Sequence, residues 1–303
     1  MAATTKQRGC FRPLQARKAY DPQNALSLAL ACDLAYEPEA VVRKTVDAWG
    51  MTLLRVVSKR KPPDIDTQCF LMSDGSNVVV VFRGSDATPD WFTNFQASQD
   101  PGPLDGTGAH EGFQDALYPA VIALTEHLHC ADGTPRKIWI TGHSLGGALC
   151  SLYAGMLIEN GIDVYGVYTF ASPRPGSPSF EQQLNKKVTG PHYRVVNAGD
   201  VVPHLPPEPF FSHPGKRIIL KSNRKERTKG SWLDERIAAL KHFVRITGER
   251  FAVGDVHGLS ASSVSYIPRL MKDLDRCERE ERAKASRRRA KTRRTSRTTD
   301  NRH

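Results

Sequence analysis

The chain has 303 residues, 39% of them hydrophobic, and carries a formal net charge of +11. A chain of this length can bury a substantial core, as one large α/β domain or as two small ones. It contains no run of 18 or more apolar residues and no apolar stretch near the N-terminus, which argues against a membrane-spanning helix and a secretory signal. We therefore expect a cytoplasmic protein without a transmembrane segment.

The first part of the folded chain is predicted to hold two helices and three strands. Their sequences are PQNALSLALACDLAY, EAVVRKTVDAW, TLLRVVS, QCFLMSDG and NVVVVFRG, within residues 22–84. The last two are rich in apolar and β-branched residues, and Asp74-Gly75 stands near their junction as a turn signal. These two strands are therefore predicted to form a hairpin.

From residue 110 onwards, strands and helices alternate. Helices are predicted at 110–129, 145–160, 232–244 and 267–285, and strands at KIWIT, VYGVYTF, HYRVVN and KRIILK. Such alternation predicts an α/β fold with a mostly parallel central sheet flanked by helices. In such sheets the functional site lies at the carboxyl ends of the strands, so residues that directly follow a strand are candidates for it.

The positive charge is concentrated at the C-terminal end. Residues 276–303 contain 12 Lys and Arg against 4 Asp and Glu, a net charge of +8, which leaves +3 for the rest. Almost every residue after Met271 is charged or small, so this segment buries too little apolar surface to offset the entropy of ordering. We predict a mobile extension at 1–20, a single domain at 21–275 and a basic disordered tail at 276–303, preceded by a helix that frays.

Three roles are open to such a tail, namely a solvated segment, contact with an anionic membrane surface, and nucleic-acid binding. Residues 287–297 contain no aromatic side chain, and single-stranded nucleic-acid binders use aromatic side chains for stacking. A solvated tail is therefore the first expectation and peripheral contact with an anionic membrane the second. Nucleic acid is the least expected partner.

A serine stands between a predicted strand and a predicted helix in the stretch ITGHSLGGAL. Gly142, Ser144 and Gly146 form the pattern G-x-S-x-G, in which the serine occupies a sharp turn and the glycines let strand and helix approach closely. The alternative is a glycine-rich connection whose serine only caps the helix. A serine nucleophile needs a base and an acid, so the presence of these partners decides between the two interpretations.

Both partners can be found after the serine, in the order that α/β-hydrolases use. Asp200 fits the acid because it directly follows a predicted strand, and His257 fits the base because it lies in a Gly-flanked loop ahead of the last helix. Other histidines lie in a charged helix, near turns or before a strand, namely His192, His204, His213 and His242. A lone loop histidine is usually a surface residue, but the order Ser144, Asp200, His257 favours catalysis.

Acyl transfer also needs hydrogen-bond donors for the developing oxyanion. The amide of Leu145, directly after the serine, is one candidate. The other comes from the turn that follows the strand VVVVF, where Gly84 and Ser85 stand. The alternative for this turn is an ordinary strand end.

Taken together, these segments resemble the class 3 lipases, the fungal-type triacylglycerol lipase family within the α/β-hydrolases. The matching segments are VVVVFRGSDATPDWFTNF, HEGFQDALY, WITGHSLGGALCSLYA, VYTFASPRPG, YRVVNAGDVVPHLPP and VHGLSASSVSYI. They span roughly residues 75–267, about two-thirds of the chain. The resemblance implies Ser144 as the nucleophile, with Asp200 as the acid and His257 as the base. It also implies Ser85 and the amide of Leu145 as the oxyanion hole.

Three aromatic residues follow the oxyanion turn with helical spacing, namely Trp91, Phe92 and Phe95. In the family a short amphipathic lid lies at this place, so the resemblance implies that these side chains cover the site and contact substrate. The alternative is packing in the core. A metal site is not expected, because the cluster at His127 and His129 lacks a second pair of ligands.

The expected activity is that of a serine hydrolase that cleaves carboxylic-ester bonds of lipids, as a triacylglycerol lipase does, without a cofactor. A phospholipase A1 or a general carboxylesterase would use the same site and differ in the shape of the pocket. A non-catalytic scaffold on a hydrolase fold is the alternative from another class. Secreted fungal members carry signal peptides and disulfides, whereas the six cysteines here are scattered and are expected to be free thiols.

Overall fold

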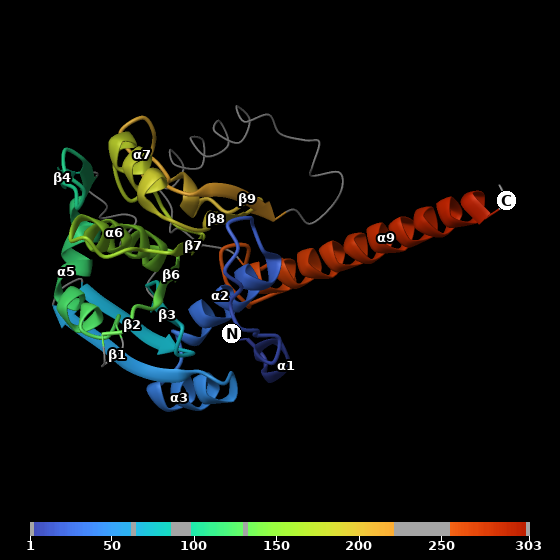
Figure 1. The fold of residues 1–303 in the computed structure, drawn as a ribbon. Helices are drawn as coiled ribbons and strands as arrows, with labels where there is room; N and C mark the ends of the chain where they lie inside the picture. The colour runs from blue at the N-terminus through green and yellow to red at the C-terminus, as the bar shows by residue number, and fades with distance from the viewer. Residues whose placement is uncertain (1–2, 62–64, 86–97, 130–132, 221–254, 301–303) are drawn as a thin grey trace.

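A seven-stranded sheet forms the centre of the protein (Figure 1). The computed structural model describes residues 3–61, 65–85, 98–129, 133–220 and 255–300. The strands of the sheet are, in spatial order, β1 (Thr52–Lys61), β2 (Ile65–Ser73), β3 (Asn77–Phe82), β6 (Lys137–His143), β7 (Gly166–Phe170), β8 (His192–Asn197) and β9 (Lys216–Leu220). A separate antiparallel pair is formed by β4 (Gln99–Pro101) and β5 (Gly108–His110).

Helices cover both faces of this sheet. One face carries α5 (Glu111–Thr125), α6 (Leu145–Glu159) and α7 (Pro178–Lys187), and the other carries α2 (Pro22–Leu34), α3 (Glu39–Ala48) and the start of α9 (Tyr266–Asp300). β1, β2 and β3 are antiparallel, whereas every neighbouring pair from β3 to β9 is parallel. The prediction of a mostly parallel central sheet flanked by helices is confirmed.

Strand β3 shows why the sheet needs both layers. Val79 and Val81 point into the core under α2, whereas Val78 and Val80 point into the core under α5 and α6. Successive side chains of a strand face opposite sides, so a strand that is apolar throughout is stable only when both of its faces are covered. β3 pairs antiparallel with β2, and Gly75 between them has a φ of +92°, as the predicted hairpin requires.

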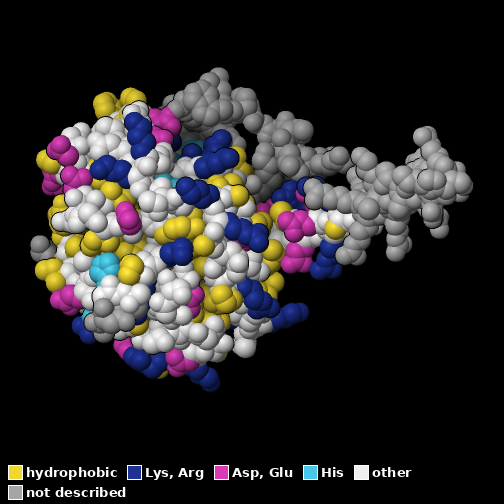
Figure 2. All heavy atoms as spheres, viewed as in Figure 1, with side chains coloured by type: hydrophobic (Ala, Val, Ile, Leu, Met, Phe, Trp, Pro, Cys, Tyr) yellow, Lys and Arg dark blue, Asp and Glu magenta, His cyan; other side chains and the backbone are white. Residues whose placement is uncertain are grey.

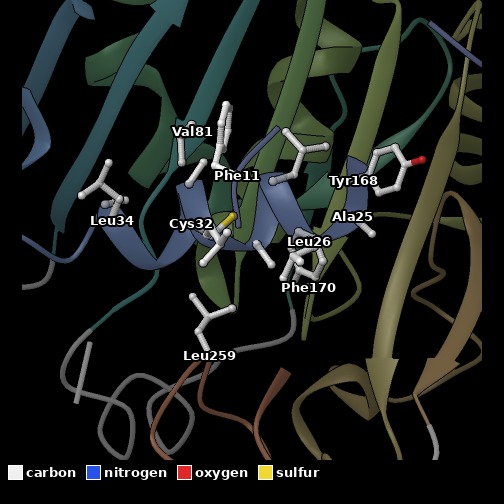
Figure 3. Close-up of a cluster of buried hydrophobic side chains, with 14 of the residues drawn as sticks. Phe11, Ala25, Leu26, Cys32, Leu34, Val81, Tyr168, Phe170 and Leu259 are labelled. Atoms are coloured by element: carbon white, nitrogen blue, oxygen red, sulfur yellow. The ribbon is translucent and has the colours of Figure 1, made fainter. Parts of the chain in front are cut away.

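Helix α2 runs across the strands on one face of the sheet (Figure 3). It begins after Asp21, whose carboxylate accepts hydrogen bonds from the amides of Gln23 and Asn24 and so caps the helix. Its side chains form a buried cluster with residues of the central strands, and Leu259 packs into the same cluster. Because Leu259 lies two residues after His257, the core around α2 also anchors the loop that carries this histidine.

The segment at residues 3–20, where a mobile extension was expected, packs against the body of the protein. Phe11 stacks on Trp49 with the ring centroids 4.2 Å apart, and the indole nitrogen of Trp49 donates to the carbonyl of Arg8 at 3.0 Å. A short helix, α1 (Thr5–Arg8), precedes the stacked ring. The apolar side chain of Phe11 is buried, and this burial stabilises the packing of the segment against the body of the protein.

Asp33, near the end of α2, joins two segments that are far apart in the chain. Its buried carboxylate accepts a hydrogen bond from the amide of Ala3 at 2.8 Å and one from the hydroxyl of Ser260 at 2.6 Å. The guanidinium of Arg8 lies 3.7 Å from the same carboxylate. Since Ser260 lies three residues after His257, the N-terminal segment and the histidine loop share one carboxylate.

Helix α9 extends through the segment that was predicted to be a disordered tail. It spans Tyr266–Asp300 and projects away from the body (Figure 1). The segment is rich in Glu, Lys, Arg and Ala, which are good helix formers, and Arg282 pairs with Glu278 one turn away at 3.3 Å. On the face shown in Figure 2, basic side chains are scattered over the body among apolar and acidic ones.

Among the described residues, no helix combines the length and the apolar character that crossing a membrane would require.

Candidate active site

Ser144 occupies a sharp turn between β6 and α6. β6 ends at His143 and α6 begins at Leu145, and the single residue between them has a φ of 56° and a ψ of −129°. A positive φ at a residue other than glycine costs about 1–3 kcal/mol and is found mostly at functional sites. A Cβ on Gly142 would collide with the carbonyl of Gly146, so strand and helix touch here and only glycine fits.

The three predicted triad residues lie within hydrogen-bond distance of one another. His257 Nε2 is 2.9 Å from Ser144 Oγ, and His257 Nδ1 is 3.1 Å from each carboxylate oxygen of Asp200. Asp200 follows β8, and His257 lies in the loop before α9, so both come to the carboxyl end of the sheet beside Ser144. All three side chains are buried. In this arrangement Nδ1–H donates to Asp200, which leaves Nε2 free to accept the serine proton.

The carboxylate of Asp200 is held by two further donors. The hydroxyl of Tyr266, in the first turn of α9, donates to Oδ2 at 2.7 Å, and the amide of Val202 donates to Oδ1 at 3.1 Å. Burial, followed by the nearby charge of Asp200, raises the pKa of Tyr266 well above its usual value. The phenol therefore stays protonated and acts as a donor. Donors on both oxygens hold the carboxylate of Asp200 in place beside the histidine.

Asn197, the last residue of β8, fixes the loop that carries the histidine. Its side-chain amide donates to the carbonyls of Val256 and Val264 at 2.7 and 2.8 Å, on the two sides of His257. Its backbone amide donates to the hydroxyl of Tyr266 at 2.9 Å. One strand end therefore orients both His257 and the tyrosine that bonds to Asp200.

The second histidine of the site, His143, is buried directly before Ser144. Its Nε2 lies 2.8 Å from the backbone carbonyl of His257. Burial, followed by the neighbouring His257, lowers the pKa of His143 to about 3. The ring is therefore neutral at physiological pH, with its single proton on the nitrogen that faces the carbonyl.

The neutral state of His143 predicts that acid destabilises the fold. The folded pKa of about 3 lies below the ordinary value of 6.5. As pH falls between these values, the unfolded chain binds a proton that the folded chain does not. The stabilising contribution of His143 is thus complete above pH 6.5. Below pH 6.5, this group lowers the free energy of unfolding by about 1.4 kcal/mol per pH unit.

Denaturant unfolding at a series of pH values measures this slope. In the variant His143→Gln, the free energy of unfolding should depend less steeply on pH, because the contribution of His143 is lost. The variant His129→Gln, at an exposed position, should keep the wild-type slope. Equal slopes in the two variants would contradict the assignment.

The turn that is predicted to supply the oxyanion hole lies beside Ser144. A Cβ on Gly84 would lie 2.7 Å from the carbonyl of His143 and 3.1 Å from Cβ of Ser144, so the two turns are in contact. Ser85 follows this glycine, and Leu145 is the first residue of α6, where backbone amides lack an intrahelical partner. Both candidates for the oxyanion hole are thus in segments adjacent to Ser144.

The other predicted site residues lie outside the described part of the chain. These are Trp91, Phe92 and Phe95 of the expected lid. The histidine His242, which competed with His257 for the role of base, lies outside it as well.

Sequence reasoning missed three residues around the predicted triad, namely Asn197, Tyr266 and Tyr36, whose hydroxyl lies 2.9 Å from Nδ1 of His143. Asn197 is the one that a local signal could have found, because it ends the same strand that Asp200 follows. Tyr36 follows the end of α2 and Tyr266 begins α9, and neither residue has a motif of its own.

Sequence comparison finds relatives among fungal lipases. Over 136 residues the chain is 37% identical to the secreted mono- and diacylglycerol lipase 1 of Fusarium solani, covering 44% of this chain and 40% of that protein. Over 169 residues it is 31% identical to the secreted mono- and diacylglycerol lipase MDL3 of Malassezia globosa, covering 50% of this chain and 54% of that protein. The chain spans about half the length, or less, of these curated relatives.

The expectation of a cytoplasmic protein is wrong. Both relatives are named as secreted lipases, which points to an extracellular rather than a cytoplasmic location. The expectation depended on the lack of an apolar stretch near the N-terminus. Such an absence at the start of a sequence does not decide where a protein resides.

The family model described as Lipase (class 3) matches residues 79–210, which include Ser144 and Asp200. Among solved structures, lipase II from Rhizopus niveus has a TM-score of 0.57 at 24% identity, over 73% of this chain and 83% of that one. This likeness confirms the predicted α/β-hydrolase fold. The family match and the fungal relatives support the resemblance to the class 3 lipases that the sequence motifs implied.

Proposed function

We propose that the protein hydrolyses carboxylic esters of glycerol lipids through a triad of Ser144, His257 and Asp200. The observation that carries the proposal is the continuous set of hydrogen bonds from the serine hydroxyl through the imidazole to the carboxylate. The strained backbone of Ser144 supports it, because a serine that only capped the helix would not need a positive φ. Ser144 also makes no side-chain capping hydrogen bond to α6.

The reaction follows from the protonation states of these groups. As Ser144 Oγ attacks the ester carbonyl, its proton passes to His257 Nε2, and the ionised Asp200 stabilises the resulting imidazolium. The oxyanion of the tetrahedral intermediate binds to Ser85 and the amide of Leu145. His257 then protonates the departing alcohol, and water hydrolyses the acyl-enzyme by the same route. Every proton transfer is carried out by residues of the chain.

The substrate class is proposed from the named relatives. The two fungal relatives are named mono- and diacylglycerol lipases, so glycerides are the first substrates to test. We would measure hydrolysis of mono-, di- and triglycerides, p-nitrophenyl esters and phospholipids by the pure protein, together with labelling by a fluorophosphonate probe. Glyceride hydrolysis with labelling is expected. Phospholipid hydrolysis alone would favour a phospholipase. The absence of both hydrolysis and labelling would contradict the esterase proposal.

Ser85 offers a separate test of the oxyanion hole. Replacing it by alanine should lower kcat by about 10- to 1000-fold, because a donor to the developing negative charge is lost. KM for a soluble ester should change little, since the donor acts on the transition state rather than on the bound substrate. We would compare the steady-state kinetics of Ser85→Ala with those of Ser76→Ala. Ser76 is an exposed serine in the β2–β3 turn and serves as the control. A kcat equal to that of the control would remove Ser85 from the oxyanion hole.

Two earlier expectations stay predictions. A lid formed by Trp91, Phe92 and Phe95 predicts a rise in rate when the substrate exceeds its solubility and forms an interface. Contact of residues 276–303 with an anionic membrane surface is supported by none of the comparisons and depends on charge alone.

A further inference from the structure

The hydroxyl of Tyr36 lies between the two turns that build the site. Tyr36 follows the end of α2, and its oxygen accepts a hydrogen bond from the amide of Gly84 at 3.1 Å. The same hydroxyl lies 2.9 Å from Nδ1 of His143. It therefore contacts the turn that precedes Ser85 on one side and the residue before the nucleophile on the other.

The direction of each hydrogen bond in this group follows from its chemistry. The carbonyl of His257 can only accept, so the proton of the neutral His143 ring lies on Nε2. Nδ1 of His143 is then an acceptor, and the partner that donates to it is the hydroxyl of Tyr36. The tyrosine oxygen keeps a lone pair for the amide of Gly84. The result is one directed chain from Gly84 through Tyr36 and His143 to the carbonyl of His257.

We propose that Tyr36 is a positioning residue, which holds the turn of Gly84 and Ser85 at a fixed distance from the backbone of His257 through this chain. The inference rests on the proposed function, because it assigns to these two segments the oxyanion hole and the base. It adds a residue that lies 107 positions before His143 and belongs to none of the predicted motifs.

The surroundings make the hydroxyl hard to replace. Gly84 and the side chain of His143 are buried, so water cannot readily substitute for a lost partner. The ring of Tyr36 has contacts that do not involve its oxygen, with the His143 ring at 6.1 Å and with the guanidinium of Arg83 at 5.7 Å. Phenylalanine would keep these contacts and remove only the hydroxyl.

The first experiment is steady-state kinetics of Tyr36→Phe on a soluble short-chain ester. We expect kcat to fall by about 10- to 100-fold with KM within about twofold, because misplaced catalytic groups affect the transition state more than substrate binding. The matched control is Tyr20→Phe. Tyr20 also has a buried hydroxyl, but within the described residues this hydroxyl has no hydrogen-bond partner, so kcat should be unchanged.

Coupling to His143 separates positioning from a general loss of stability. If Tyr36 acts through the histidine, Tyr36→Phe should have a much smaller effect on kcat in a His143→Ala background than in the wild type. Thermal unfolding of each variant is followed by circular dichroism. Additive effects of the two substitutions, or a fall in kcat that only tracks the fraction of unfolded protein at the assay temperature, would overturn the proposal.

The second readout does not depend on turnover. In protein labelled with 15N-histidine, NMR should place the proton of His143 on Nε2, with Nδ1 as an acceptor. Tyr36→Phe should move the Nδ1 resonance or mix the two tautomers, and Tyr20→Phe should do neither. A proton on Nδ1 in the wild type, or an unmoved resonance in Tyr36→Phe, would overturn the proposal. An inactive wild type with the expected tautomer would contradict the esterase function instead.

Discussion

Replacing Ser144 by alanine should lower kcat for ester hydrolysis by about 10⁴-fold or more while the protein still folds. The substitution removes the one atom that forms the acyl-enzyme and leaves the packing between β6 and α6 in place. Alanine also has a Cβ, so the strained backbone of this turn meets no new steric demand. Burst kinetics on a p-nitrophenyl ester, thermal unfolding and fluorophosphonate labelling measure the effect.

A matched control lies on the same helix. The hydroxyl of Ser151 bonds back to the carbonyl of Gly147 at 3.2 Å and has no predicted part in catalysis, so Ser151→Ala should stay active and labelled. Near-wild-type turnover or continued labelling of Ser144→Ala would show that another residue is the nucleophile.

Loss of the base should be about as damaging as loss of the nucleophile. His257→Ala removes the group that accepts the serine proton, so kcat should fall by about 10⁴-fold or more. Asp200→Asn should cost somewhat less, about 10³- to 10⁴-fold. The amide introduced at position 200 would donate to Nδ1 of His257, so the imidazole proton would lie on Nε2. The geometry would survive, but Nε2 could no longer accept the proton of Ser144.

The pH dependence of kcat/KM and the kinetic constants of both variants are measured beside His129→Ala, at an exposed histidine that should be dispensable. Full activity in His257→Ala would reject this histidine as the base. Full activity in Asp200→Asn would reject Asp200 as the acid of the triad.

That Ser144 and Asp200 lie close together could be predicted because each of them stands after a strand of the parallel sheet. Ser144 stands between an apolar strand and an apolar helix, and Asp200 directly follows a strand. In a parallel sheet these strand ends meet at one edge, so chain order alone brings them together. The loop of His257 was identified from its place in that order, and the hydrogen bond to Ser144 agrees with the choice.

The supporting residues could not be predicted because their role depends on tertiary packing. Tyr36 contacts His143 over 107 positions, and Tyr266 contacts Asp200 over 66. Nothing in the composition around either tyrosine distinguishes it from a core aromatic residue. The helix predicted at 267–285 continues to Asp300, which was not expected, since low apolar content argues against burial but not against helix formation in a segment rich in Glu, Lys, Arg and Ala.

The shared carboxylate of Asp33 matters for how the protein is handled in the laboratory. The amide of Ala3 and the hydroxyl of Ser260 bind the same side chain, so a purification tag fused ahead of Ala3 would sit at one end of a contact whose other end is the loop of His257. A fluorescent label there would disturb the loop that it was meant to report on. The far end of α9 projects away from the body (Figure 1), and a tag or label beyond it leaves that contact untouched.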